Sequence, residues 1–152
     1  NGVPEGLSGR APPRVAVVVF NADVLIAYLG RDDAHHSEAV ERVRRALEPK
    51  TRRLVSAVTY TESLIGPLET AGPAGADTVD AMFVRLGIET IQVDMALARQ
   101  AAAVRARTKL KLPDAYALAT AIHAEERGHN DVRIESFDRK VNTAFAELHP
   151  PA

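Results

Sequence analysis

The stretch VVVFNADVLIAYLG, residues 17–30, decides the fold. A run of apolar, mostly β-branched residues ends at Asn21 and Asp23, and a second apolar run follows at once. Unbroken β-branched runs are typical of strands that are buried on both faces of a parallel sheet. The sequence therefore predicts a strand over residues 15–20 and a short helix over residues 23–29 that ends at Gly30. An amide and a carboxylate lie where the strand gives way to the helix.

The rest of the chain alternates between strand patterns and helix patterns. Further strands are predicted at residues 53–57, 88–93 and 132–137. Helices are predicted at residues 37–48, 59–69, 77–86 and 94–108, from Leu112 to Gly128, and after Asp138; Gly66 and Pro67 weaken the second of these. This alternation predicts an α/β fold with a central, mainly parallel sheet that is covered by helices on both faces.

Composition limits the possible functions. The chain has 152 residues, which suits one domain, and its 46% hydrophobic and 26% charged residues are ordinary for a globular protein. A net charge of −1 argues against binding nucleic acid by bulk charge, so any basic footprint must be local. The absence of cysteine excludes disulfides, thiol catalysis and cysteine zinc sites. It also fits a reducing cytoplasm, which is where we expect the protein to be located.

The ends of the chain set the expected domain boundary. Residues 1–13 are rich in glycine and proline and lack the apolar core of a signal peptide. We interpret residues 1–13 as a flexible leader or a cloning remnant, and residues 14–149 as a single domain. No apolar stretch approaches the ~20 residues that span a bilayer, so we expect no membrane partner.

Four polar residues from separate elements are candidates for one site: Asn21, Glu62, Asp114 and Asp138. Ligands of open α/β sheets bind beyond the carboxyl ends of the strands, where we expect these side chains to converge. Glu62 lies on a helix face that is predicted to be buried, and a buried carboxylate needs a cation or a donor. Oxygen ligands without cysteine or histidine favour Mg²⁺ or Mn²⁺, which suits phosphodiester hydrolysis.

Each candidate also has an ordinary structural interpretation. Asp114 can satisfy free N–H groups at a helix start. Asp138 can open a turn or cap the last helix, and Glu62 can reach solvent or an arginine. Asn21 and Asp23 can cap the helix that follows them. The order and context of all the candidates together favour a shared site.

Four segments resemble the motifs of PIN-domain ribonucleases, and most closely those of the VapC toxins of bacterial toxin–antitoxin pairs. The segments are VVVFNADVLIAYL (17–29), VSAVTYTESL (55–64), LKLPDAYALATAI (110–122) and ESFDRKV (135–141). The resemblance covers about residues 15–145, and its third segment is the most distinctive. It implies a PIN-like three-layer α/β/α fold and RNA cleavage that depends on Mg²⁺ or Mn²⁺.

The resemblance also implies roles for the candidate residues. Glu62, Asp114 and Asp138 match the second, third and fourth acids of the family, and Asp114 and position 21 match its metal ligands. Asn21 departs from the family pattern, which has Asp there; the amide has nearly the same size but no charge. We therefore expect a weakened or inactive nuclease. Either a deliberate substitution or natural degeneration explains Asn21, and the three remaining acids favour the first.

Basic residues flank the candidate site. Lys109, Lys111, Arg139 and Lys140 are interpreted as contacts to the RNA backbone, with a solvated surface as the alternative. A further basic group, from Arg42 to Arg53, is interpreted as surface only. Aromatic residues make up 5% of the chain and none is Trp, so no base-stacking platform is evident.

The stretch RDDAHHSE, residues 31–38, combines acids with two histidines. It could suggest a transition-metal site. Adjacent side chains on a helix do not face each other, however, so we interpret His35 and His36 as part of a helix start.

Three functions are consistent with the sequence. The first is a metal-dependent endoribonuclease toxin. The second is a PIN-like module that binds RNA or protein without cleavage, which Asn21 favours. The third is a phosphohydrolase that acts on small substrates. For the toxin, the resemblance implies an RNA substrate, a VapB-type antitoxin and a homodimer. It also predicts an apolar groove near the helices of residues 23–29 and 38–47 that leads to the acids.

Overall fold

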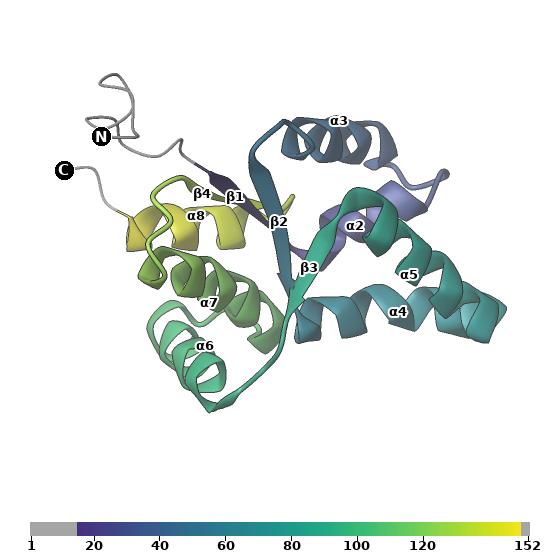
Figure 1. Cartoon of the computed structure of the whole chain (residues 1–152). Helices are drawn as coiled ribbons and strands as arrows, with labels where there is room; N and C mark the ends of the chain where they lie inside the picture. Colours follow the sequence, from purple (N-terminus) through teal and green to yellow (C-terminus); the bar gives the residue numbers. More distant parts are fainter. Residues whose placement is uncertain (1–14, 150–152) are drawn as a thin grey trace, which may run out of the picture.

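The computed structural model describes residues 15–149, and the predicted leader, residues 1–13, lies outside the described residues. Within this range, strands alternate with helices or helix pairs (Figure 1). The elements are β1 (Ala16–Phe20), α2 (Ala22–Leu29), α3 (His36–Ala46), β2 (Thr51–Ser56), α4 (Ala57–Ala71), α5 (Pro73–Leu86), β3 (Ile88–Ile91), α6 (Met95–Thr108), α7 (Leu112–Glu126), β4 (Val132–Glu135) and α8 (Arg139–Leu148). No helix among the described residues is both long and apolar enough to cross a bilayer.

The four strands form one parallel sheet in the order β3-β2-β1-β4, which confirms the predicted α/β fold. β3 and β4 end two residues earlier than predicted. The reason is that the strand beside each of them ends there. Ile91 pairs with Ser56, the last residue of β2, and Glu135 pairs with Phe20, the last residue of β1. All four strands therefore stop at the same edge of the sheet, and polar residues follow there.

Helices cover both faces of the sheet, as predicted. Val18 and Phe20 of β1 pack with α2, α3 and α5 in one cluster of buried side chains. Val17 and Val19, which point to the other face, pack against α7 and α8. Figure 1 shows α2–α5 on one side of the sheet and α6–α8 on the other. The core is thus divided between two layers of helices with β1 buried between them.

Helix α4 is continuous, although the sequence predicted a weakened helix at Gly66 and Pro67. A proline ring in a helix clashes with the Cβ of the preceding residue, and Gly66 has none. The first turn of the helix is stabilised because the buried Ser56 Oγ accepts a hydrogen bond from the Thr59 N–H at 3.2 Å. This start places Glu62 one and a half turns from the end of β2.

Candidate active site

The first polar residue after β1 is Asn21, and its side chain is fully engaged. Only 4% of Asn21 is exposed. Its Nδ2 donates to Asp114 Oδ1 and to Ser136 Oγ, both at 3.2 Å. Its Oδ1 accepts from the Ala22 N–H at 3.0 Å and so caps α2. The predicted cap is therefore present, and the same amide also joins β1 to the start of α7 and to the end of β4.

Ser136 is the residue that the sequence interpretation missed. It is completely buried directly after β4. Its hydroxyl donates to Asp23 Oδ2 at 3.0 Å and accepts from Asn21 and from the Asp138 N–H. One hydroxyl thus connects three of the polar positions. The only signal in the sequence is its place at the end of a strand, two residues before Asp138.

Asp23 and Asp114 are half-buried and lie at the two ends of this hydrogen-bonded chain. The carboxylate of Asp23 also accepts from the Phe137 N–H at 2.9 Å and from the Val24 N–H at 2.8 Å. Burial raises the pKa of Asp23, these hydrogen bonds lower it, and the charge of Asp114 raises it again. Asp114 belongs to the first turn of α7, where no side chain caps the helix. It therefore contacts the polar network and does not act as the expected cap.

Glu62 lies within electrostatic reach of the same acids. Burial is the largest cause of its raised pKa, and repulsion from Asp114 and then Asp23 adds to it. Lys111 opposes the shift. No ion pair among residues 15–149 involves any of the three carboxylates. The result is a concentration of negative charge that Lys111 offsets only in part.

Asp138 lies at the margin of this network. It is exposed, and its carboxylate accepts from the Lys140 N–H at 2.8 Å, so it caps α8 as one of the two interpretations expected. Its own N–H donates to Ser136 Oγ. Asp138 and Asp23 line a common hollow of about 420 Å³. Asp138 is therefore connected to the other acids through Ser136 and this hollow.

The donor set fits a hard divalent cation. Its members are carboxylate oxygens, and carboxylates that repel one another are stabilised when a cation lies between them. As arranged here, no three acidic or histidine side chains of the described residues are close enough together to hold an ion. Mg²⁺ usually binds through one or two carboxylates and keeps several waters, so Asp114 with one neighbour is a sufficient protein contribution.

The predicted RNA-binding residues are exposed beside the acids. Lys109 ends α6 in a left-handed conformation with φ of 65°, and Lys111 precedes α7. Arg139 and Lys140 form the first turn of α8. In contrast, four arginines of the basic group from Arg42 to Arg53 form ion pairs or donate to carbonyl groups; they are Arg42, Arg44, Arg52 and Arg53.

The stretch at residues 31–38 forms the connection into α3. Asp33 Oδ1 accepts from the His35 N–H at 2.8 Å, and His36 Nδ1 lies 2.9 Å from the Ala27 carbonyl. The predicted role in a helix start is therefore observed.

An apolar groove is present beside α2, which is one of the two helices expected. It encloses about 440 Å³ and is lined by α2, α4 and the start of α5 rather than by α3. The lining residues include Ile26, Leu29, Gly66, Pro67 and Ala71. A groove beside the second expected helix, residues 38–47, stays a prediction; Val40 in that helix is 39% exposed.

Comparisons with known proteins agree with this fold. The sequence model of the PIN domain family matches residues 18–147. Comparison with curated protein sequences gives no significant match.

Solved structures with a similar fold include three from bacterial toxins and toxin–antitoxin complexes. VapC20 of Mycobacterium tuberculosis, described as a toxin that cleaves the sarcin–ricin loop, has a TM-score of 0.65 and 18% identity over 84% of this chain and 94% of that chain. VapBC-1 of nontypeable Haemophilus influenzae has a TM-score of 0.62 and 12% identity, covering 86% and 93%. A toxin–antitoxin complex from Klebsiella pneumoniae has a TM-score of 0.58 and 23% identity, covering 80% and 86%. At these identities, the likeness shows the fold.

Proposed function

The chain belongs to the PIN domain family, and on this premise we propose that it is a divalent-metal-dependent endoribonuclease and the toxin of a toxin–antitoxin pair. One observation carries the proposal: the carboxylates of Asp23, Glu62 and Asp114 repel one another at the carboxyl edge of the sheet. Such a site attracts a cation, and it lies where α/β folds bind their substrates. The fold likeness to a toxin described as cleaving the sarcin–ricin loop supports RNA as the substrate.

Each acid has a separate role in this proposal. Asp114 and position 21 would hold the metal, which would supply an activated water and neutralise charge on the phosphate. The raised pKa of Glu62 equips it to take a proton from the attacking water. Asp138 orients that water from the open side of the site. Ser136 holds Asp23 and Asn21 in place through its hydrogen bonds. Mg²⁺ or Mn²⁺ is the proposed ion, because the donors are oxygen atoms.

Asn21 weakens this activity in two ways. The amide carries no charge, so position 21 adds little to the attraction for the metal. Its Nδ2–H also occupies Oδ1 of Asp114, an oxygen that the metal would use. The chain as written is therefore an impaired nuclease, whereas Asp at position 21 gives a competent one.

The substrate lies along the basic residues on either side of the acids. Lys109 and Lys111 contact the RNA backbone on the α7 side, and Arg139 and Lys140 contact it on the α8 side. Their exposure leaves their charges free for phosphate, and such contacts position the chain without reading its sequence.

The protein partner is a small antitoxin of the VapB type, and the toxin itself is a homodimer. The apolar groove between α2 and α4 supports the first part, because 44% of Ile26 is exposed at its margin and Ile26 also lines the acidic hollow. A segment that fills the groove therefore reaches the acids. The homodimer rests on the family resemblance and is tested by the molar mass in solution.

Asn21 also favours a second function, a PIN-like module that binds RNA or protein without cleavage. One experiment distinguishes the two functions. Asn21→Asp is expected to bind Mn²⁺ about tenfold or more tightly than the unmodified chain, and to cleave RNA only with Mg²⁺ or Mn²⁺ present.

Adding Asp114→Ala to Asn21→Asp should abolish cleavage, and single-stranded DNA and nucleoside monophosphates should stay intact. If Asn21→Asp binds metal but cuts no RNA, the nuclease is contradicted and the binding module replaces it. Hydrolysis of the monophosphates would instead favour a phosphohydrolase.

A further inference from the structure

A hollow beside the acids is lined partly by residues that the proposed catalysis leaves unused. It encloses about 420 Å³, within the roughly 300–1,000 Å³ that is typical of small-molecule sites. Asp23 and Asp138 form its side toward the catalytic acids. Asp33, His35 and Phe137 form other parts of its wall. The loop before α3 therefore faces the proposed site of cleavage.

Two rings in this wall are held in place. His35 stacks on Phe137 with 5.0 Å between the ring centroids and 26° between the planes. Arg42 lies 4.8 Å from the centroid of the Phe137 ring and is itself fixed by Glu38, Glu135 and the Ser136 carbonyl. The His35 side chain is exposed, so a flat aromatic surface is ready to receive another ring.

The carboxylates in the wall have free acceptor oxygens. Asp33 uses Oδ1 for the His35 N–H, and Asp138 uses Oδ1 for the Lys140 N–H. Neither Oδ2 accepts a hydrogen bond from a described residue. A phosphate is repelled by such a wall, whereas a ligand that offers N–H groups is attracted. The hollow thus combines a stacking surface with acceptors.

We propose that this hollow is a nucleobase subsite that selects guanine next to the scissile phosphate. Guanine presents two adjacent N–H donors on its pairing edge, which one carboxylate can accept together. Adenine and cytosine present one amino group beside an acceptor, and uracil presents one N–H between two carbonyls. Unstacked bases of single-stranded RNA bind proteins by this combination of stacking and edge contacts.

That the bound base lies next to the scissile phosphate depends on the proposed function. Asp23 both lines the hollow and belongs to the hydrogen-bonded chain that reaches Asp114. A base in the hollow therefore has its phosphate near the acids. Arg139 and Lys140 follow Asp138 directly and can hold the next phosphate of the strand.

The subsite is tested first without cleavage, by titrating the unmodified chain with GMP, AMP, CMP and UMP and following the His35 and Phe137 resonances by NMR. GMP should bind about fivefold or more tightly than the others, the lower end of what a bidentate base contact contributes. Asp33→Asn keeps the Oδ1 that supports the turn but replaces the free acceptor with a donor. It should remove the preference for GMP. His35→Ala should weaken the binding of all four nucleotides.

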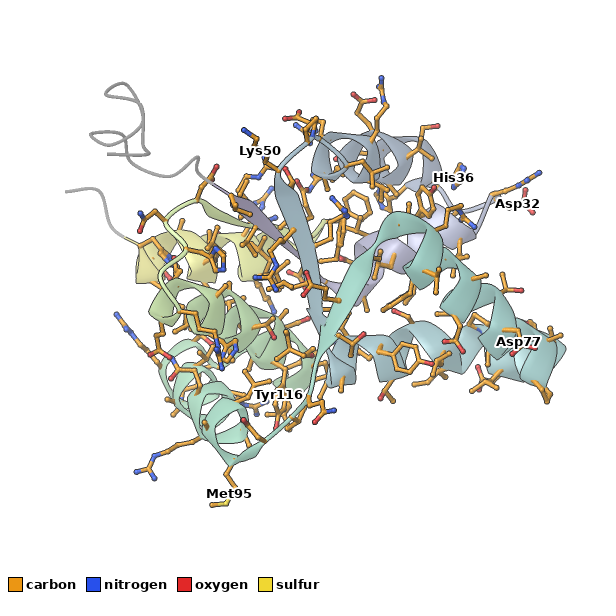
Figure 2. All side chains as sticks on the ribbon, in the orientation of Figure 1. Asp32, His36, Lys50, Asp77, Met95 and Tyr116 are labelled. Atoms are coloured by element: carbon orange, nitrogen blue, oxygen red, sulfur yellow. The ribbon has the colours of Figure 1, made fainter. Side chains whose placement is uncertain are left out.

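Asp32→Asn is the matched control, since Asp32 is exposed in the same loop and does not line the hollow (Figure 2). It should leave the affinities unchanged. Equal binding of the four nucleotides, or a preference for GMP that survives Asp33→Asn, would overturn the subsite. Binding of N-acetylarginine amide at His35 without binding of GMP would overturn it too and assign the hollow to a protein partner.

Cleavage mapping then separates this inference from the proposed function. In the Asn21→Asp background, cuts should lie next to guanine, and Asp33→Asn should spread them over other bases. If RNA is cut with no base preference, the guanine subsite is wrong and the nuclease stands. If GMP binds as expected but no RNA is cut, the subsite stands and the nuclease is wrong.

Discussion

At the scale of single residues, Ser136 determines how the polar network is arranged. A serine hydroxyl has one proton, and here it is donated to Asp23 while two N–H groups donate to the same oxygen. Asn21 is the natural partner for this arrangement, because its amide offers a proton to Ser136 and another to Asp114. The metal-free network is thus satisfied with an amide at position 21, which explains why the chain can fold around it.

We expect Ser136→Ala to lower the free energy of unfolding by about 1–3 kcal/mol. The alanine leaves a buried amide N–H, a carboxylate oxygen and the Asp138 N–H without their shared partner. Urea unfolding monitored by circular dichroism measures the change. Ser37→Ala, on the exposed face of α3, should stay within about 0.5 kcal/mol of the unmodified chain. Equally small changes in the free energy of unfolding at both positions would show that the hydrogen bonds of Ser136 do not stabilise the fold.

The raised pKa of Glu62 makes the stability of the metal-free protein depend on pH. Its pKa in the folded state is raised above 4.5, so the unfolded chain ionises first as the pH rises. The resulting penalty is absent below pH 4.5 and complete above the raised pKa. Glu62→Gln should therefore raise the Tm at pH 7, by no more than about 2 °C because the half-exposed carboxylate is screened by water.

The same comparison at pH 4 should show almost no difference for Glu62→Gln, because both states are then mostly protonated. Glu48→Gln, in the exposed turn after α3, serves as the control and should change the Tm little at either pH. Thermal melts in the presence of a chelator make the measurement. A stabilisation that is as large at pH 4 as at pH 7 would exclude the proposed repulsion among the acids.

At the scale of secondary-structure elements, α4 and α5 approach each other unusually closely at Gly75. A Cβ on Gly75 would lie 2.0 Å from the carbonyl oxygen of Pro67. Gly75→Ala should therefore lower the free energy of unfolding by about 3 kcal/mol or more, since two helix backbones would have to separate. The opposite change one residue away, Ala74→Gly, should cost only about 0.5–1 kcal/mol. Chemical denaturation of both variants compares them, and a tolerated alanine at position 75 would contradict the close approach.

The positions of the elements were largely predictable, whereas their ends and contacts were not. β1 and the helix after it follow from local patterns of apolar residues, which is why residues 15–29 were assigned well. The ends of β3 and β4 depend on the length of the neighbouring strand, which no local pattern contains. The role of Ser136 depends on partners more than 100 positions away in the chain, such as Asn21 and Asp23.

At the scale of the whole molecule, the parallel sheet brings the separate segments to one edge, and the groove continues from that edge over α2. Four segments carry the acids, and three of these segments follow β1, β2 and β4, whose ends lie at this edge. The sequence predicted a groove beside α2 but not the part that α4 and α5 form, because that part depends on how α5 folds back on α4 at Gly75. An exposed Ile26 lies between the groove and the acidic hollow, so one bound partner can cover both.

This geometry leads to a prediction about the antitoxin that is proposed as a partner. Ala71 is exposed at the end of α4 and lines the groove, so Ala71→Arg introduces a charge into an apolar site. An arginine at the C-terminal end of a helix is favourable for the helix itself, so folding should be preserved. We expect Ala71→Arg to weaken binding of the small protein encoded beside the toxin by about tenfold or more, because a buried charge without a partner is costly.

The control is Ala81→Arg, because Ala81 is exposed on α5 and does not line the groove. It should bind the neighbouring protein as the unmodified chain does, in a pull-down and by calorimetry. In the Asn21→Asp background, Ala71→Arg should also restore growth arrest in the presence of that protein, whereas Ala81→Arg should not. If both arginines weaken binding equally, the partner does not use the groove. If the neighbouring protein fails to bind the unmodified chain, the antitoxin assignment itself is contradicted, while RNA cleavage remains open to its own test.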